Sequence, residues 1–136
     1  MRLLIDTNVI LDVLMEREPF CRSAQAVLMA VAEEKAQGFI TASSVTDLYY
    51  LLRKHLHNQQ EAKQALMGLL AVVEVLDVTG SDCERAFELQ MPDYEDALLA
   101  WCAKRHKIDR IVTRNQMHFE GSPVQAVLPD DLLRNL

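Results

Sequence analysis

Short apolar runs alternate along the chain with longer segments in which apolar residues recur every three to four positions. Residues 3–5 (Leu-Leu-Ile) form an uninterrupted apolar run, which is typical of a buried strand. The spacing that follows predicts a helix over about 8–16. Pro19 fits the first turn of a second helix that extends through Val31, and Gly38 would end that helix.

The same alternation continues through the rest of the chain. Residues 39–42 predict a second strand, after which Ser43 or Ser44 would cap a helix. The apolar positions of that helix are Val45, Leu48, Tyr49 and Leu52. The remaining expected elements are a helix over 59–71, a β-rich segment over 72–78, a helix from Ser81 or Asp82, the clearest helix over 93–107, strands over 108–113 and 124–128, and a terminal helix opened by Pro129.

Strands that alternate with helices predict an α/β fold of three layers, α/β/α, with a central parallel sheet of about four to five strands. We expect residues 1–136 to form one domain, because the sequence has no internal repeat and no linker rich in Pro, Gly or Ser. Right-handed crossovers place the strand-to-helix turns along one edge of such a sheet, and sites in open parallel sheets lie at that edge.

Composition agrees with a globular protein, because half of the 136 residues are apolar and a quarter are charged. No apolar run is long enough for a membrane span, and Asp6 interrupts the start too early for a signal peptide. We therefore expect a cytoplasmic protein without a membrane partner. Three dispersed cysteines form neither a disulfide framework nor a zinc spacing, and we expect buried, reduced thiols.

The formal net charge of −6 at first argues against a nucleic-acid partner. The distribution of charge matters more, because carboxylates gathered at a metal leave the remaining surface closer to neutral. Basic clusters occur at 53–55 and 104–107. They permit an RNA partner, although cations near helix C-termini also favour the helix dipole.

Polar groups gather at four places where a strand gives way to a helix or a helix begins. Each group has an alternative interpretation as a helix cap, since Asx and Ser residues followed three positions later by an acid are typical of helix N-termini. The four segments are Ile5-Asp6-Thr7-Asn8, Ser43-Ser44-Val45-Thr46-Asp47, Pro92-Asp93-Tyr94-Glu95-Asp96 and Thr113-Arg114-Asn115.

Taken together, the acids indicate a metal site. Asp6 follows a wholly apolar strand, and the spacing of Asp93 and Asp96 allows both to point from one helix face. Carboxylates gathered without a cation repel one another, and ligands that are all oxygen favour Mg²⁺ or Mn²⁺. Because no nucleophilic Ser or Cys motif accompanies them, the acids predict metal-assisted hydrolysis of a phosphodiester.

Three motifs resemble those of PIN-domain ribonucleases of the VapC toxin kind. Residues 4–12 (Leu-Ile-Asp-Thr-Asn-Val-Ile-Leu-Asp) resemble the opening motif of that family. Residues 96–100 (Asp-Ala-Leu-Leu-Ala) resemble its third acidic motif, and residues 111–115 with Phe119 resemble its fourth. The motifs follow the family's order and cover nearly the whole chain. The resemblance implies a Mg²⁺- or Mn²⁺-dependent endoribonuclease, often the toxin of a toxin–antitoxin pair.

The resemblance also assigns roles to individual residues. It makes Asp6 and Asp96 metal ligands, with Asp93 one turn earlier as a further acid of the site. Asp47 stands near the second acidic position, where the family more often has Glu, and Asn115 stands where many relatives have Asp. Because Asn115 is neutral, we expect one tightly bound ion rather than two. The residues expected to contact the substrate are Thr7, Asn8, Arg114 and His118.

Partners are likewise implied by the resemblance. VapC-like toxins form homodimers, and a cognate antitoxin lays a helix or strand across the active-site face. Helices near 45–56 and 59–70 are apolar enough to offer a groove to it, with Tyr49, Tyr50 and Met67, unless those side chains belong to the core.

Two rival functions follow from the same residues. A response-regulator receiver of similar size needs paired acids after the first strand and a late Lys, whereas Asp6 precedes Thr-Asn and the late strand ends in Thr-Arg-Asn. The receiver is therefore excluded. A PIN-like fold that binds RNA or protein without catalysis stays open, because Asp47 and Asn115 depart from the family pattern.

Overall fold

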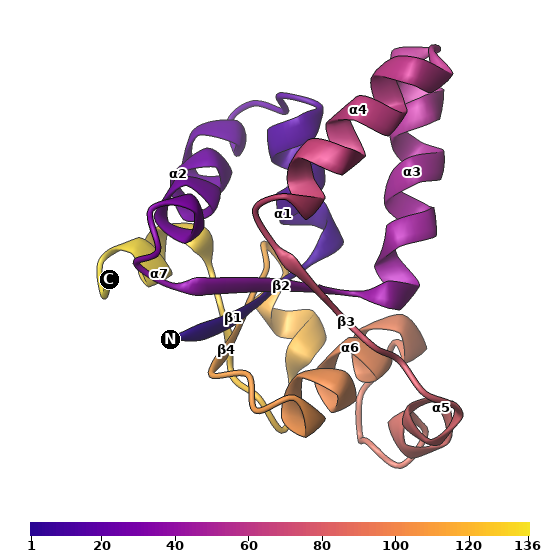
Figure 1. Ribbon diagram of the computed structural model, residues 1–136. Helices are drawn as coiled ribbons and strands as arrows, with labels where there is room; N and C mark the ends of the chain where they lie inside the picture. The colour runs from indigo at the N-terminus through magenta and orange to yellow at the C-terminus, as the bar shows by residue number, and fades with distance from the viewer.

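Five parallel strands form the sheet at the centre of the molecule, in the order β3-β2-β1-β4-β5 (Figure 1). The computed structural model describes all of residues 1–136. The strands are β1 (Arg2–Ile5), β2 (Gln37–Thr41), β3 (Glu74–Leu76), β4 (Arg110–Val112) and β5 (Ala126–Val127). The parallel sheet predicted from the alternation of strands and helices is confirmed.

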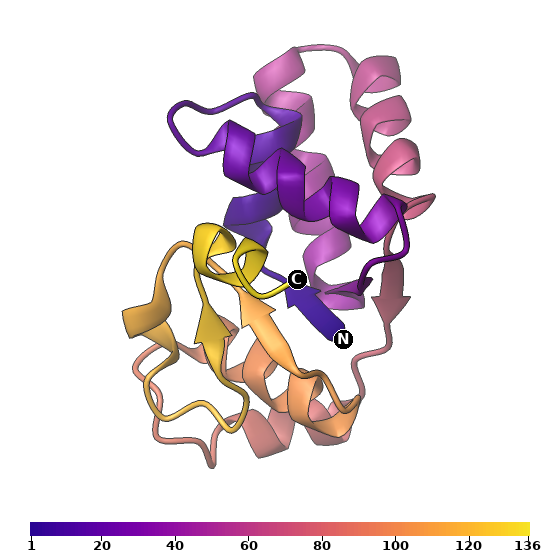
Figure 2. The same ribbon diagram turned by 90° about the vertical axis from the view of Figure 1, so that its left-hand side faces the viewer.

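Helices cover both faces of this sheet, which confirms the three-layer α/β/α architecture (Figures 1 and 2). One layer holds α1 (Thr7–Leu14), α2 (Cys21–Ala32), α3 (Ala42–Leu56), α4 (Gln59–Leu70) and α7 (Pro129–Leu133). The other holds α5 (Gly80–Ala86), α6 (Tyr94–Arg105) and the 3₁₀ turn η1 (Gln116–Phe119). Figure 2 shows α7 beside α2, where the C-terminal segment closes the first layer.

The core divides in two because successive side chains of a strand point to opposite faces of the sheet. Leu3 and Ile5 of β1 pack with α1–α4, whereas Leu4 between them packs with α6. Ile111 and Val112 of β4 divide between the two clusters in the same way. Uninterrupted apolar runs in the sequence thus mark strands that are buried on both faces.

The end of α2 differs from the prediction. The helix ends at Ala32, and the chain turns at Glu34, whose φ is 60°. Gly38, expected to end that helix, lies inside β2, where a Cβ atom would approach the Val31 methyls to 2.9 Å. This glycine therefore serves close packing of α2 on the sheet. At the other end, α2 begins at Cys21, so Pro19 lies before its first turn.

Two helix starts also differ from the predictions. Neither Ser43 nor Ser44 caps α3; the N-cap is Thr41, whose hydroxyl lies 2.9 Å from both serine hydroxyls. The N-cap of α5 is Thr79, which forms a capping box with Asp82 at its third helical position. Only Thr79 caps its helix with its side chain, and the N-cap of α3 lies two to three residues before the serines expected there.

Cysteine burial follows the prediction at two of three positions. Cys21 and Cys102 are buried, and all three cysteines are free. Cys83, on the short helix α5, is exposed. None of the helices has both the length and the apolar character needed to cross a membrane.

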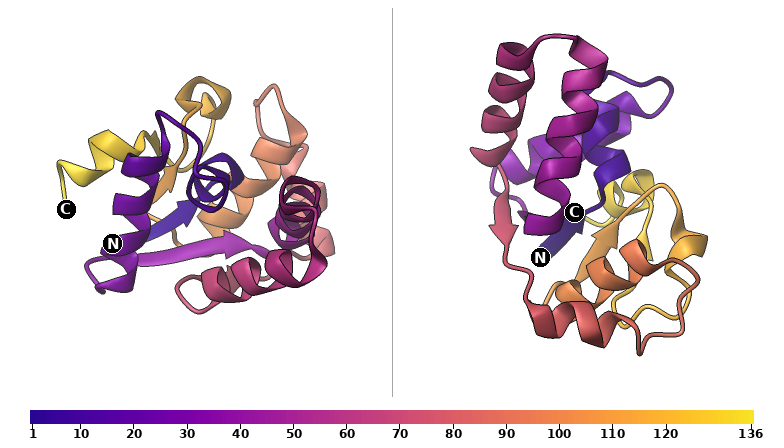
Figure 3. Two further views of the ribbon diagram at one scale, coloured as in Figure 1. Left: turned by 90° about the horizontal axis from the view of Figure 1, so that it is seen from above. Right: turned by 90° about the vertical axis from the view of Figure 1, so that its right-hand side faces the viewer.

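Strands β1 and β2 point toward the start of α3, and both chain ends lie at the opposite side of the molecule (Figure 1). Seen toward the strand ends, α3 rises from the sheet edge while α6 lies below it (Figure 3, right). The carboxyl edge of the sheet is therefore flanked by helix starts from both layers.

Candidate active site

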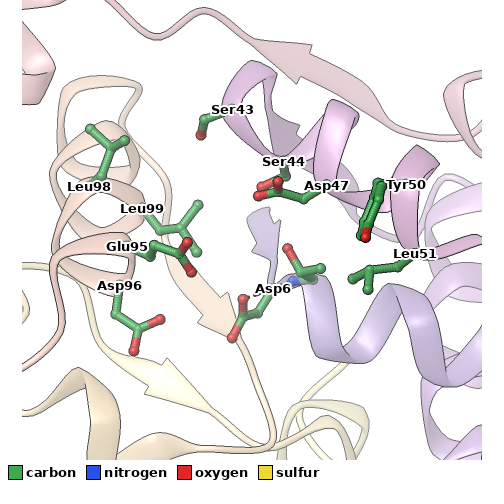
Figure 4. A pocket seen from close by; sticks show the side chains of 11 residues that line it. Asp6, Ser43, Ser44, Asp47, Tyr50, Leu51, Glu95, Asp96, Leu98 and Leu99 are labelled. Atoms are coloured by element: carbon green, nitrogen blue, oxygen red, sulfur yellow. Dashed lines mark hydrogen bonds between the residues drawn. The ribbon is translucent and has the colours of Figure 1, made fainter.

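A cavity of about 490 Å³ opens at the carboxyl end of β1, between α3 and α6. Figure 4 shows side chains of the two helices facing each other across it, with Asp6 between them. The lining residues are Asp6, Thr7, Ser43, Ser44, Asp47, Tyr50, Leu51, Glu95, Asp96, Leu98 and Leu99. Carboxylates and apolar side chains thus line the same cavity.

Asp6 follows β1 and caps α1, and its carboxylate is held by groups at the start of α1 and directly after β4. Oδ1 accepts a hydrogen bond from the Thr7 backbone N–H at 2.8 Å. Oδ2 accepts one from the Thr113 hydroxyl at 2.8 Å and one from Asn8 Nδ2 at 3.3 Å. Burial raises the pKa of Asp6, and the bonds from Thr113 and Thr7 partly oppose that rise.

Asp96 faces Asp6 from the first turn of α6 (Figure 4). Its pKa rises to about 6 because burial disfavours the charge and because the carboxylates of Asp6 and Asp93 repel it. His118 opposes the rise, with Nδ1 at 3.8 Å from Asp96 Oδ2. A cation between Asp6 and Asp96 would remove this repulsion.

Asp93 is exposed and acts as the N-cap of α6, its Oδ2 accepting the Asp96 backbone N–H at 3.0 Å. Its side chain is not part of the cavity wall, although its charge acts on Asp96. Asp47 lines the cavity from α3. Asn115 is exposed and lies outside the wall, and its backbone N–H donates to Thr113 Oγ1 at 3.1 Å.

The residues predicted to contact substrate divide into two groups. Thr7 lines the cavity, and His118 lies against Asp96. Asn8 and Arg114 are instead engaged with other protein groups. The Asn8 amide spans Asp6 and the Arg114 backbone N–H, which it accepts at 3.4 Å. Arg114 Nε donates to Asp12 Oδ2 at 2.7 Å, and its guanidinium lies 4.0 Å from the Phe20 ring centroid.

Sequence reasoning missed Asp12 and Thr113 as supporting groups. Asp12 has 1% side-chain exposure and pairs with both Arg17 and Arg114. Thr113 is fully buried and directs its hydroxyl at Asp6. Both residues lie in motifs quoted for the family resemblance. Local spacing gives no signal for the contacts of Asp12 with Arg114 and of Thr113 with Asp6, because the partners are over 100 residues apart in the sequence.

The donor set fits a small divalent cation that keeps part of its water shell. No three His, Cys, Asp or Glu side chains lie close enough to enclose a metal ion. Mg²⁺, however, commonly binds through one or two carboxylates and completes its shell with water and substrate phosphate. Asp6 and Asp96 supply two such carboxylates.

The protein is an α/β/α protein with acidic side chains at the carboxyl edge of its parallel sheet. In proteins of this class the functional site lies at the ends of the strands. Residues 2–117 match the sequence profile of the PIN domain family. This chain belongs to the PIN domain family. A comparison with curated protein sequences gives no match.

Solved structures share this fold over nearly the whole chain. VapBC2 from Rickettsia felis, bound to a promoter DNA fragment, is 19% identical with a TM-score of 0.74, covering 94% of this chain and 98% of that one. A toxin–antitoxin complex from Klebsiella pneumoniae is 24% identical with a TM-score of 0.69, covering 93% and 97%. VapC20 from Mycobacterium tuberculosis, a sarcin–ricin loop cleaving toxin, is 16% identical with a TM-score of 0.65, covering 80% and 86%. At these identities the likeness establishes the fold alone.

Proposed function

We propose that this protein is a divalent-metal-dependent endoribonuclease that hydrolyses RNA phosphodiester bonds, and that it is the toxin of a toxin–antitoxin pair. The observation that carries the proposal is the convergence of Asp6 and Asp96 from different elements at one cavity. PIN domain membership supports nuclease activity. The description of VapC20 as a sarcin–ricin loop cleaving toxin supports RNA as the substrate class.

Asp6 and Asp96 would hold the Mg²⁺ or Mn²⁺ ion, which when bound supplies an activated water and neutralises charge on the phosphate. Donors from Thr113 and Thr7 keep the Asp6 carboxylate in one orientation. Leu98 and Leu99 line the same cavity, so that part of its wall is apolar. Such an environment strengthens the interaction between the carboxylates and a cation.

Other residues have supporting roles in the proposal. Asp47 and Glu95 lie on opposite walls of the cavity, where their carboxylates would orient water beside the phosphate. His118, next to Asp96, would contact the substrate from the η1 side. Asp93 and Asn115 stay predictions as site residues; Asp93 contributes its charge, and Asn115 follows the strand that carries Thr113.

An antitoxin partner is part of the proposal. The similar structure from Klebsiella pneumoniae is a toxin–antitoxin complex, and that from Rickettsia felis is VapBC2 bound to a fragment of its promoter DNA. A homodimer and a cytoplasmic location are consistent with an RNA-cutting toxin and complete the proposal. Light scattering of the purified chain, alone and with a co-expressed neighbouring gene product, tests the assembly.

The decisive experiment is cleavage of mixed single-stranded and structured RNA by protein freed of any bound partner. We expect cutting with Mg²⁺ or Mn²⁺, none with EDTA, and none by an Asp96→Asn variant with metal. The matched control is Asp131→Asn, which changes a half-exposed acid on α7 outside the cavity wall and should leave cutting normal. Cutting that persists in EDTA or in Asp96→Asn would contradict the proposal.

A second candidate function is RNA or protein binding without catalysis by the same fold. The departures from the family pattern at Asp47 and Asn115, with Asn115 outside the cavity wall, favour it. In that case RNA binding persists in EDTA, and no RNA is cut with any divalent metal. Filter binding with and without EDTA, beside the cleavage assay, separates the two functions.

A further inference from the structure

The α3 helix leads away from the cavity and carries three exposed side chains suited to RNA. Tyr50 lines the cavity and is 67% exposed. Arg53 and Lys54 follow three and four positions later, so they continue the same helix face by one turn. We call Tyr50, Arg53 and Lys54 the α3 track.

The two cations of the α3 track are free. Both are exposed, and no carboxylate of the chain lies within ion-pair distance of either. By contrast, the arginines Arg17, Arg105 and Arg114 are paired with buried acids. Unpaired cations on a chain of net charge −6 can attract phosphate without first breaking an internal pair.

The order of acidic, aromatic and basic side chains along α3 is suited to a single strand of nucleic acid, with its scissile phosphate, bases and further phosphates. Lys54 lies about 10 Å along the helix axis from Asp47, given the rise of an α-helix. Between them stands Tyr50, whose ring is positioned at the cavity wall (Figure 4). Proteins that bind single strands combine aromatic rings that stack on bases with cations that follow the backbone.

Figures 1 and 3 show no other helix or strand on the outer side of α3. It rises from the end of β2 and packs against α4, so that only part of its surface is covered. Tyr49 is the neighbour that packs against the core. Tyr50 is therefore available to a partner that also enters the acidic cavity.

We propose that the α3 track binds the RNA strand next to the scissile phosphate, with Tyr50 stacking on a base and Arg53 and Lys54 contacting the following phosphates. This inference rests on the proposed RNA hydrolysis and adds a substrate-recognition surface to it. The acidic cavity repels a polyanion, and the track supplies the attraction that the cavity lacks.

The test measures binding of a fluorescein-labelled single-stranded RNA of mixed sequence to the Asp96→Asn protein, which leaves the RNA intact. Tyr50→Ala should weaken binding about tenfold, the size of one base–aromatic stack, and Tyr50→Phe should restore it. Arg53→Ala and Lys54→Ala should each reduce the slope of log affinity against log salt concentration by about 0.7.

Lys104→Ala is the matched control. Lys104 is exposed and unpaired in the last turn of α6, so it shares the helix-end environment of Lys54 but lies toward the other edge of the sheet. Its removal should leave affinity and salt slope unchanged. Circular dichroism melting of every variant excludes loss of folding as the cause.

Binding and salt slope unchanged by Tyr50→Ala and Lys54→Ala would overturn the α3 track, and would assign this face of α3 to another partner such as a protein. The result of this binding test does not depend on whether the protein cleaves RNA. If the wild type cuts no RNA but binding still depends on the track, the hydrolysis proposal fails and the track stands.

Discussion

Thr113 donates its hydroxyl hydrogen to Asp6 Oδ2 over 2.8 Å, joining the ends of the neighbouring strands β1 and β4. Both residues are buried, and the same Thr113 oxygen accepts the Asn115 backbone N–H. The bond sets the orientation of the Asp6 carboxylate from behind. With Thr7 and Asn8 also donating to Asp6, about one acceptor position of its carboxylate is left for a cation.

Thr113→Val tests this orientation, because valine keeps the shape and removes the hydroxyl. We expect metal affinity or RNA cleavage to fall about 10- to 100-fold, the usual effect of losing a group that orients a metal ligand. Thr113→Ser keeps the hydroxyl and should retain most activity. The assay is Mg²⁺-dependent cleavage; equal rates for the valine and serine variants would refute the role of the bond.

Asp96→Asn should stabilise the metal-free protein at neutral pH. The raised folded pKa of about 6 means that ionising Asp96 above that pH costs stability, and the amide carries no charge. Since one pKa unit corresponds to about 1.4 kcal/mol and Asp96 is partly solvated, we expect a gain of about 1 kcal/mol.

Urea unfolding at about pH 7 and about pH 4 measures the effect, which should be absent at the lower pH. Added Mg²⁺ should stabilise the wild type more than the variant. A variant less stable than the wild type at neutral pH would show that the charge on Asp96 does not destabilise the folded protein.

Asp12→Asn should destabilise the protein and loosen the Thr113–Asn115 turn. Asp12 is buried and holds Arg114 at 2.7 Å and Arg17 at 2.9 Å. Removing one side of a buried ion pair leaves the other charge uncompensated, so we expect a loss of about 3 kcal/mol. Arg17→Ala removes the more exposed partner and should cost less. Equal losses in thermal melts would contradict this ranking.

The stability that Asp82 contributes should depend on pH. Burial alone would raise its pKa, but hydrogen bonds from the Arg105 guanidinium and Thr79 lower it to about 2. The contribution is therefore complete above the ordinary pKa of about 4 and is lost as the pH falls toward 2.

Asp82→Asn should cost about 3 kcal/mol at neutral pH, as expected for a broken buried pair. The difference from the wild type should shrink between about pH 4 and pH 2. Asp77→Asn is the control, because Asp77 also contacts Arg105 but is exposed. A difference that stays constant down to about pH 2 would show that Asp82 does not titrate with folding.

The parallel sheet and the position of the acids at its carboxyl edge could be predicted in outline from the sequence. The run Leu3–Ile5 is apolar because β1 lies at the centre of the sheet, and Asp6 follows it at the carboxyl edge. The helix with Asp96 has a polar start and an apolar buried face. Both acids could therefore be placed from local pattern, because the functional sites of such sheets lie at the strand ends, where helices begin.

Element boundaries and supporting contacts were less predictable. The sequence predicts a helix stop at Gly38, since glycine favours helix ends, but the glycine is needed for close packing against Val31. The strand expected over 124–128 has two paired residues, because only Ala126 and Val127 reach β4. The contact of Asp12 with Arg114 has no local signal, because the two residues become neighbours only where β1 pairs with β4.

The central claim is that Asp6 and Asp96 together hold one divalent cation. Electron paramagnetic resonance of Mn²⁺ titrated into metal-free protein tests it directly, with Asp6→Asn, Asp96→Asn and the control Asp131→Asn. Asparagine also caps helices well, so Asp6→Asn should keep α1 intact. We predict one bound Mn²⁺ in the wild type and in Asp131→Asn, and none in either site variant. Unchanged Mn²⁺ binding in Asp6→Asn and Asp96→Asn would contradict the account.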